Sequence, residues 1–373
     1  MPDISARTPH RTLYRVHDFM TGLDFHGSLG AEAIIVKFLQ VPCLLLAIGM
    51  LLTSCAEERD TARLLGTTMG TQYSVTIVTG QRSDDESLNL EIQALLARVN
   101  ASMSTYDPTS ELSRVNKNKS TDWIDISPAL YSVLVAALSV SEASDGAFDV
   151  TVGGLVNLWG FGPERGSGAI PETNALEAAR REVGSANLQV QADPPALRKS
   201  RADLSIDLSG IAKGYAVDQI AALLIEKDFK DFLVDIGGEM RAVGTNKNGV
   251  AWNIGIENPR DAGHQILRTI SLRDTGLASS GNYRNFFEIE GLYYGHTIDP
   301  RTGAPTQHEL AAVSVVHPSA MMADAWATAL MSMGYTAGLK VAAQRNLAVL
   351  FIVDDGTMST VTKSATFDVA TKP

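Results

Sequence analysis

The chain has 373 residues and a formal net charge of −11, with 31 Lys and Arg residues against 42 Asp and Glu residues. This acidic balance, without any basic run, argues against a nucleic-acid-binding surface. The only two cysteines, Cys43 and Cys55, lie in or directly after an apolar N-terminal stretch, so the rest of the chain offers no disulfide, catalytic thiol or cysteine metal site.

An apolar stretch near the N-terminus resembles an export signal. Residues 38–52 are almost wholly apolar, follow Lys37 and run into Leu52-Thr-Ser-Cys55. A membrane-spanning helix needs ~20 apolar residues, so this stretch is short for a span. The pattern is typical of a bacterial lipoprotein signal in which Cys55 becomes the lipidated first residue, carrying acyl chains such as palmitate. It predicts an exported protein that is lipid-anchored to the bacterial membrane and faces the periplasm.

Residues 1–35 do not fit the short basic start of a signal peptide, because they are polar and include acidic side chains. We therefore interpret Val36 as the true translation start and residues 1–54 as an extension plus signal peptide. A charged tether is expected over residues 55–65, followed by a catalytic unit over residues 66–373. That unit is long enough for one large domain or for two packed subdomains.

Apolar periodicity and turn residues predict a mixture of helices and strands in the catalytic unit. Strands and helices do not alternate regularly, so the fold class is α+β with mixed, largely antiparallel sheets and packed helices. The predicted helices are residues 88–104, 111–116, 128–143, 176–182, 211–227 and 319–334, and the predicted strands are residues 73–78, 202–207, 231–235, 239–244, 252–257, 267–272, 276–279 and 311–316, with a hairpin over 285–298 and a helix–strand pair around 336–353.

The segment Asp207-Leu-Ser-Gly-Ile-Ala-Lys-Gly-Tyr215 joins a predicted strand to a predicted helix. A helix start presents unpaired backbone N–H groups and the positive end of the helix dipole, both of which favour an anion. Lys213 in the first turn adds a charge suited to phosphate. Asp207 beside phosphates indicates a magnesium ion or a donor on a ligand. An ordinary helix cap by the aspartate and serine explains the same residues without a ligand.

Asp324 and Thr328 are four residues apart in a predicted helix, so their oxygens share one helical face. A carboxylate, a hydroxyl and one or two carbonyls form an incomplete shell of hard oxygens, which suits magnesium bound together with substrate phosphates. The neighbouring residues are small and apolar, and a carboxylate in such surroundings calls for a cation. The alternative is a surface aspartate and threonine with local hydrogen bonds.

A third cluster, residues 295–305, follows the predicted hairpin. His296 ends a predicted strand, and Asp299-Pro300 begin a turn. Histidine is the commonest general acid or base near neutral pH. A structural histidine beside a plain turn is the alternative.

Taken together and in this order, these segments resemble the ApbE family of FAD:protein FMN transferases. The resemblance rests on eight motifs spread over residues 69–328. They are Met69-Gly-Thr-Gln-Tyr-Ser74, Met103-Ser-Thr-Tyr-Asp-Pro-Thr-Ser-Glu-Leu-Ser-Arg-Val-Asn116, Gly146-Ala-Phe-Asp-Val-Thr-Val-Gly-Gly-Leu-Val-Asn-Leu-Trp-Gly-Phe-Gly162, Asp207 to Tyr215, Val234-Asp-Ile-Gly-Gly-Glu239, Ser279-Ser-Gly-Asn-Tyr-Arg-Asn285, His296-Thr-Ile-Asp-Pro300 and Ala323-Asp-Ala-Trp-Ala-Thr328.

The resemblance implies an ApbE-like (T-fold-like) architecture, with a non-Rossmann flavin site between any two subdomains. The sequence agrees on the flavin site, since it lacks a Gly-x-x-x-x-Gly-Lys-[Ser/Thr] motif and residues 160–166 lack the spacing of a dinucleotide fingerprint. The implied reaction uses FAD as substrate. A Thr or Ser hydroxyl of a target protein attacks the FMN-side phosphorus, AMP leaves, and FMN remains as a phosphoester. Mg²⁺ is implied as the ion that neutralises the pyrophosphate.

The resemblance also assigns roles to individual residues. It implies that magnesium is held by Asp324, Thr328 and the carbonyls of Gly210 and Ala327. It makes His296 the candidate general base or hydroxyl-positioning residue, with Asp299 as the second candidate. Position 213 is a lysine or a carboxylate in the family. The implied flavin contacts are Met69, Tyr106, Ala147, Phe148, Asp149, Asp207, Lys213 and Ile298.

Two other functions fit the same residues. Some relatives hydrolyse FAD to FMN and AMP with water as the attacking group, and a non-enzymatic flavin-binding lipoprotein would store FAD. The magnesium pair and His296 favour catalysis over storage, while transferase and hydrolase share one site.

The acceptors implied by the family are subunits of sodium-pumping NADH:quinone reductase or Rnf-type complexes and small FMN-carrying domains, which carry a D-x-x-[ST]-G-A-[ST]-like motif. The segment Asp299-Pro-Arg-Thr302-Gly-Ala-Pro305 partly matches this motif, but Pro305 replaces the last hydroxyl residue. A plain turn therefore explains it better than self-flavinylation at Thr302.

Overall fold

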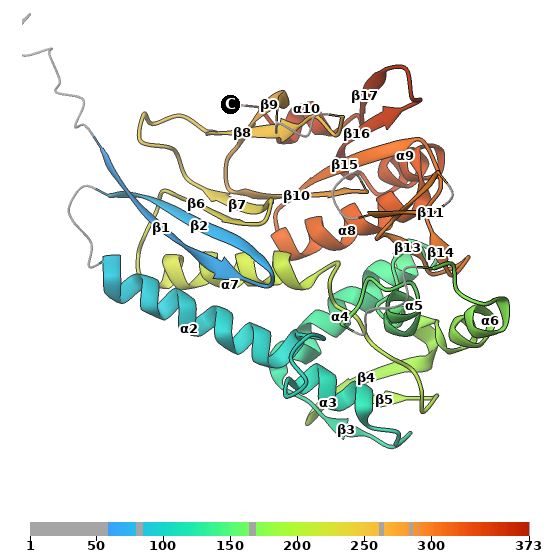
Figure 1. Ribbon diagram of the computed structural model, residues 1–373. Coiled ribbons are helices and arrows are strands. Elements are labelled where there is room, and N and C mark those ends of the chain that lie inside the picture. The colour runs from blue at the N-terminus through green and yellow to red at the C-terminus, as the bar shows by residue number, and fades with distance from the viewer. Residues whose placement is uncertain are drawn as a thin grey trace, which may run out of the picture. The chain divides into compact units, whose positions relative to one another are not determined.

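An antiparallel eight-stranded sheet organises the described part of the chain, in the order β1-β2-β6-β7-β10-β15-β16-β17 (Figure 1). The computed structural model describes residues 59–79, 85–163, 169–260, 265–282, 286–289 and 291–372, all within the unit Glu58–Pro373. The strands are β1 (Asp60–Thr68), β2 (Thr71–Thr79), β6 (Phe232–Ile236), β7 (Glu239–Val243), β10 (Thr275–Gly281), β15 (Leu310–His317), β16 (Ala348–Asp354) and β17 (Ser359–Lys363).

Side chains that alternate along the strands build a core on each face of this sheet. In β15, Val313 and Val315 pack into the larger core on the helix side, whereas Ala312 and Val316 belong to the second core. This is the period-two pattern of a strand buried on both faces. The helices of the first face are α2 (Asp85–Met103), α7 (Ala212–Glu226), α8 (Ala320–Met333) and α9 (Tyr335–Gln344), and the second face is covered by the hairpin of β8 (Trp252–Glu257) and β9 (Ile266–Leu272) and by α10 (Phe367–Ala370).

A smaller, mainly helical region joins the large sheet through α4, which contacts α8 and α2. Its three-stranded sheet has the order β3-β5-β4. Two short hairpins, β11 with β12 and β13 with β14, lead back to β15. The elements of this region and the two hairpins are α3 (Glu111–Lys117), β3 (Ile124–Asp125), α4 (Pro128–Ala143), α5 (Gly153–Leu158), α6 (Thr173–Glu182), the 3₁₀ turn η1 (Ser185–Asn187), β4 (Leu188–Ala192), β5 (Pro195–Lys199), β11 (Phe286–Ile289), β12 (Leu292–Gly295), β13 (Ile298–Asp299) and β14 (Ala304–Pro305).

The predicted α+β class with antiparallel sheets and packed helices is confirmed, as are the principal helices and most predicted strands. The strand predicted over residues 202–207 is wrong, because this segment is irregular except for one parallel bridge between Ser205 and Val152. Side chains satisfy its backbone instead. The amide of Asn116 donates to the Ile206 carbonyl and accepts from the Ile206 N–H, both at 2.8 Å.

The tether expected over residues 55–65 is wrong from residue 60 onward, since these residues form β1. Only Leu64 and Thr68 of this strand are buried, so β1 lacks the alternating apolar pattern by which a strand is predicted. Cys55 and the predicted signal lie outside the described residues. Among the residues that are described, no helix is long and apolar enough to cross a membrane.

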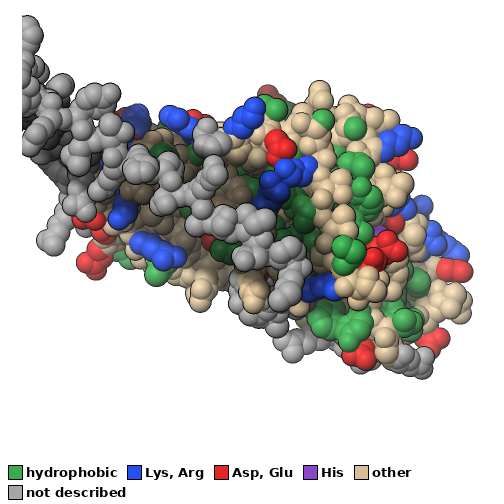
Figure 2. Space-filling view, turned by 90° about the horizontal axis from the view of Figure 1, so that it is seen from above, with side chains coloured by type: hydrophobic (Ala, Val, Ile, Leu, Met, Phe, Trp, Pro, Cys, Tyr) green, Lys and Arg blue, Asp and Glu red, His purple; other side chains and the backbone are tan. Residues whose placement is uncertain are grey.

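The surface of the described unit carries mixed charge. Figure 2 shows Lys and Arg side chains interspersed with Asp and Glu side chains on the face seen from above, where the described residues form no continuous basic surface. This mixture of charges is consistent with the acidic net charge of the whole chain.

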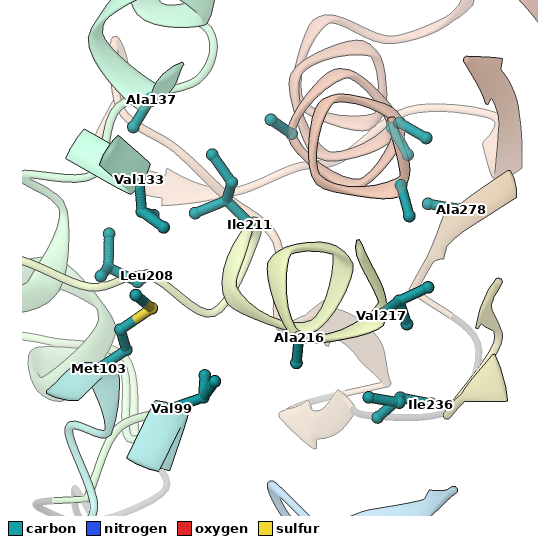
Figure 3. Packing of buried hydrophobic residues seen from close by; sticks show 14 of the residues in the cluster. Val99, Met103, Val133, Ala137, Leu208, Ile211, Ala216, Val217, Ile236 and Ala278 are labelled. Carbon is teal, nitrogen blue, oxygen red and sulfur yellow. The ribbon is translucent and has the colours of Figure 1, made fainter. Parts of the chain in front are cut away.

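Packing fixes the segment that enters α7. Leu208 lies beside Met103 of α2, and Ile211 lies between α4 and α8, near Val133 (Figure 3). Both side chains are fully or almost fully buried. Burying an apolar side chain of this size is worth about 1.5–3 kcal/mol, so these two anchors hold the intervening Ser209 and Gly210 in place.

Candidate active site

The start of α7 lies against α8 at a distance that only glycine allows. A Cβ atom on Gly210 would lie 2.9 Å from Oγ1 of Thr328 and 3.2 Å from a ring carbon of Phe148. A Cβ atom on Gly214 would clash with the carbonyl oxygen of Ala320. The segment 210–214 therefore runs along residues 320–328, and it brings Gly210, Thr328 and Phe148 together as predicted.

Asp324 is almost fully buried on α8, with 2% of its surface exposed. Its Oδ2 accepts a hydrogen bond of 3.0 Å from the backbone N–H of Gly214, in the first turn of α7. Burial raises the pKa of Asp324, while the Lys213 ammonium and the Gly214 N–H lower it. The carboxylate thus sits at the positive end of the α7 dipole, where a negative charge is stabilised.

Thr328 adds a hydroxyl to the face of α8 that carries Asp324. The hydroxyl of Thr328 lies 3.5 Å from the hydroxyl of Ser280 on β10, and Ala327 is fully buried. Within the described part of the chain, no three or more His, Cys, Asp and Glu side chains are grouped to hold a metal ion. In the predicted set Asp324 is the one carboxylate, and the hydroxyl and carbonyls are neutral hard oxygens. Such donors fit Mg²⁺, which binds through one or two carboxylates plus substrate phosphates.

An ion pair between a partly buried lysine and a buried glutamate lies beside this face. Lys213, in the first turn of α7, places Nζ 2.9 Å from Oε1 of Glu239 at the start of β7. Burial opposes the charge of Lys213, but the carboxylates of Asp324 and Glu239 raise its pKa above the ordinary value. The pKa of Glu239 is raised to about 7, because burial and the Asp324 charge together outweigh the lowering by the Lys213 ammonium. Lys213 therefore interacts with two carboxylates.

Sequence reasoning assigned no role to Glu239, although its motif was recognised. The strands β6 and β7 are joined by Gly237 and Gly238, both with positive φ (61° and 101°), and Ile236 pairs with Glu239 across this two-residue turn. Such a turn requires positive φ at both central residues, which glycine supplies readily. The Gly-Gly pair directly before Glu239 could therefore have indicated from the sequence that a tight turn fixes the position of this carboxylate.

Four other predicted flavin contacts, Asp207, Ala147, Phe148 and Asp149, are buried, and both aspartates make local hydrogen bonds. Asp207 accepts a 2.7 Å hydrogen bond from the Ser209 N–H, as a local turn requires. Oδ1 of Asp149 accepts from the N–H and the hydroxyl of Thr151, and burial raises the pKa of Asp149 despite these bonds. These contacts give both aspartates a structural function of their own.

Met69 and Tyr106 occupy different surroundings. Met69 lies at the turn between β1 and β2 with a positive φ of 50°, partly buried against the main core. Tyr106 is 65% exposed and donates from its hydroxyl to the carbonyl of Phe161 at 3.0 Å. An exposed ring held at one end in this way is suited to stack on a planar ligand.

An aromatic cluster, which the sequence did not predict, supports the segment containing His296. Tyr294 stacks on Trp159 and Phe287 with centroid distances of 5.8 and 5.7 Å, and Phe287 stacks on Phe161 at 4.9 Å. His296 follows β12 directly, is exposed, and meets the Phe161 ring edge-on at 6.4 Å. The cluster therefore fixes the β11–β12 hairpin against the segment after α5.

Ile298 and Asp299 lie in β13, just beyond the histidine. Ile298 is buried with Leu155 and Trp159. Both oxygens of Asp299 are bound by the Arg301 guanidinium, with Nε to Oδ1 at 2.9 Å and Nη2 to Oδ2 at 3.0 Å. Both carboxylate oxygens of Asp299 are therefore already hydrogen-bonded to Arg301.

Comparison with known proteins points to one family. The ApbE family model matches residues 69–351. The FAD:protein FMN transferase of Vibrio cholerae is 40% identical over 314 residues, which cover 83% of this chain and 93% of that protein. The FAD:protein FMN transferase of Haemophilus influenzae is 41% identical over 327 residues, covering 86% and 94%. The solved structure of the flavin transferase ApbE from Vibrio cholerae superposes with a TM-score of 0.77 at 38% identity, covering 84% of this chain and 99% of that one.

Proposed function

The chain belongs to the ApbE family, and from this premise we propose that it uses magnesium to move FMN from FAD to a Ser or Thr hydroxyl of target proteins. The underlying activity is that of an FAD:protein FMN transferase. The observation that carries the proposal is the convergence of Gly210, Asp324 and Thr328 at the positive end of α7. A pyrophosphate and its counter-ion need an arrangement of this kind.

In this proposal Asp324, Thr328 and the carbonyls of Gly210 and Ala327 hold the magnesium ion. When bound, the ion neutralises charge on the pyrophosphate and polarises the phosphorus that is attacked. The α7 N-terminus and the Lys213 ammonium add positive charge beside the same phosphates. The chain's own residues thus bind and orient the diphosphate so that AMP can leave with its charge stabilised.

The acceptor hydroxyl needs a group that takes its proton. His296 is exposed at the end of β12, and the aromatic cluster beneath it fixes the hairpin that carries it. Asp299 is the weaker candidate because Arg301 occupies both of its carboxylate oxygens. We therefore assign general-base or hydroxyl-positioning action to His296.

The proposal extends to where the enzyme works and what it modifies. Lipidation at Cys55 would anchor it to the bacterial membrane on the periplasmic side. Its acceptors would be proteins with a D-x-x-[ST]-G-A-[ST]-like motif, in respiratory complexes of the sodium-pumping or Rnf type or in FMN-carrying domains. The support for the anchor is the sequence 38–55 alone.

Mass spectrometry of an acceptor domain tests the function. The domain is incubated with the protein, FAD and Mg²⁺, and we expect its mass to rise by one FMN phosphoester while AMP appears. A matched acceptor with Val in place of the motif hydroxyl residue should stay unmodified. FMN and AMP released without any modified acceptor would favour the FAD hydrolase, and intact FAD in every sample would favour the storage lipoprotein.

A further inference from the structure

Folding stability alone does not explain why the Lys213–Glu239 ion pair is placed beside the candidate site. Glu239 is 4% exposed, and its second oxygen, Oε2, is buried without a hydrogen-bond partner among the described atoms. Burying a charged carboxylate with an unsatisfied oxygen is unfavourable, and a buried ion pair often adds no net stability over apolar residues. A residue kept in such surroundings is a candidate for a function.

Lys213 has two carboxylates within electrostatic reach. Its ammonium forms the 2.9 Å ion pair with Glu239, and the next residue, Gly214, donates its backbone N–H to Asp324 at 3.0 Å, so Lys213 also lies close to that carboxylate. Asp324 is the carboxylate that the proposed magnesium site requires. An ammonium paired with Asp324 would compete with a divalent cation for the same oxygens, and its positive charge would repel that cation.

We propose that Glu239 is a positioning residue that holds the Lys213 ammonium away from Asp324 and so keeps the Asp324 carboxylate available to a divalent cation. The proposal rests on the magnesium site of the proposed function. The two-glycine turn between β6 and β7 fixes Glu239 at the first position of β7, and contacts between β7 and α7 keep it beside Lys213. The ammonium then remains near the diphosphate without occupying the metal ligand.

The test measures cation binding directly. Mn²⁺ is titrated into the purified protein with ADP present, which supplies a pyrophosphate but no FMN, and free Mn²⁺ is followed by electron paramagnetic resonance. In Glu239→Gln the unpaired ammonium turns to Asp324, so we expect the Kd for Mn²⁺ to rise ~10–100-fold, as is typical when an outer partner of a metal ligand is lost. In the double variant Lys213→Met with Glu239→Gln the competitor is gone, so at saturating ADP the Kd should fall well below that of Glu239→Gln, although the diphosphate has lost the attraction of the Lys213 ammonium.

Asp235→Asn is the matched control, because it makes the same carboxylate-to-amide change in the β6–β7 hairpin, where Asp235 accepts from the Gly238 N–H. It should leave Mn²⁺ binding unchanged, and thermal melting of every variant reports on folding. An unchanged Kd in Glu239→Gln, or a double variant as weak as the single one, would overturn the positioning role. If wild-type protein bound no Mn²⁺ and transferred FMN in the presence of a chelator, the proposed magnesium site would be wrong, and so would the inference that rests on it.

Discussion

Asp324 has two functions that can be separated by substitution. Its Oδ2 accepts the hydrogen bond from the Gly214 N–H at the start of α7, and its charge is proposed to bind magnesium. Asp324→Asn keeps an oxygen of similar position and size but removes the charge. Asp324→Ala removes both. Comparing the two variants therefore separates helix capping from metal binding.

The structure sets the size of each effect. Asp324→Ala leaves the buried Gly214 N–H without its acceptor, and an unsatisfied buried donor costs about 1–3 kcal/mol. In domains of 150–250 residues ~1 kcal/mol shifts Tm by ~2–4 °C, so this variant should melt a few degrees lower while staying folded. Asp324→Asn should melt close to wild type, because its amide oxygen can accept the same bond. Both variants should lose magnesium-dependent FMN transfer by at least ~100-fold, as expected when a group that stabilises transition-state charge is removed.

Thermal melting and single-turnover FMN transfer over a series of Mg²⁺ concentrations measure the two effects on the same preparations. The expected result is that Asp324→Asn uncouples them, with normal stability and no transfer. If both variants kept full activity after the metal was removed by a chelator, the site of Asp324, Thr328 and two carbonyls would be wrong.

Three further predictions use the same assays. His296→Ala should bind FAD almost unchanged but transfer FMN at least ~100-fold more slowly, the low end of general-base effects; an unchanged single-turnover rate would remove the histidine from the mechanism. Thr328→Val should be milder than either Asp324 variant and raise the Mg²⁺ concentration needed for half-maximal rate, since water can replace a neutral ligand; a loss as complete as that of Asp324→Asn would contradict this ranking. Cys55→Ala should leave the membrane fraction with full activity in vitro, whereas a variant that stays in the membranes with its signal uncleaved would indicate a membrane-spanning helix.

The sequence predicted the proximity of candidate site residues where they lie in short contiguous segments. Asp324 and Thr328 share a helical face because they are four residues apart, with Asp324 buried and Thr328 partly buried on α8. Gly210 and Lys213 were found because a glycine turn before a helix marks a phosphate-binding start. That these two segments touch follows only from the fold, since α7 and α8 are separated by some ninety residues of β-strands and turns.

The prediction of a strand over residues 202–207 was wrong because side chains, and not a β-ladder, satisfy the backbone hydrogen bonds there. The segment 202–207 is held by the Asn116 amide and by the buried Lys199 ammonium, which donates to the carbonyls of Val115 and Asn118 and, at 3.5 and 3.4 Å, to those of Ala202 and Leu204. No periodicity in the segment itself reports such long-range partners. Glu239 was missed for the same reason, because its partner Lys213 lies in another element and neither residue's spacing indicates the pair.

Under the proposed function, the close approach of α7 and α8 predicts that metal and substrate bind together. Without ligands, Asp324 already has three sources of positive charge or potential: the Gly214 N–H, the α7 dipole and the Lys213 ammonium. A divalent cation arriving alone would compete with the first two for the carboxylate and would be repelled by the nearby ammonium, which Glu239 holds in an ion pair. A pyrophosphate is attracted by the same helix N-terminus and ammonium, and once bound it supplies the additional oxygens that a magnesium ion needs. Under the proposed function we therefore expect joint binding, in which the diphosphate of FAD would offset the positive potential at the start of α7 and supply ligands to the cation.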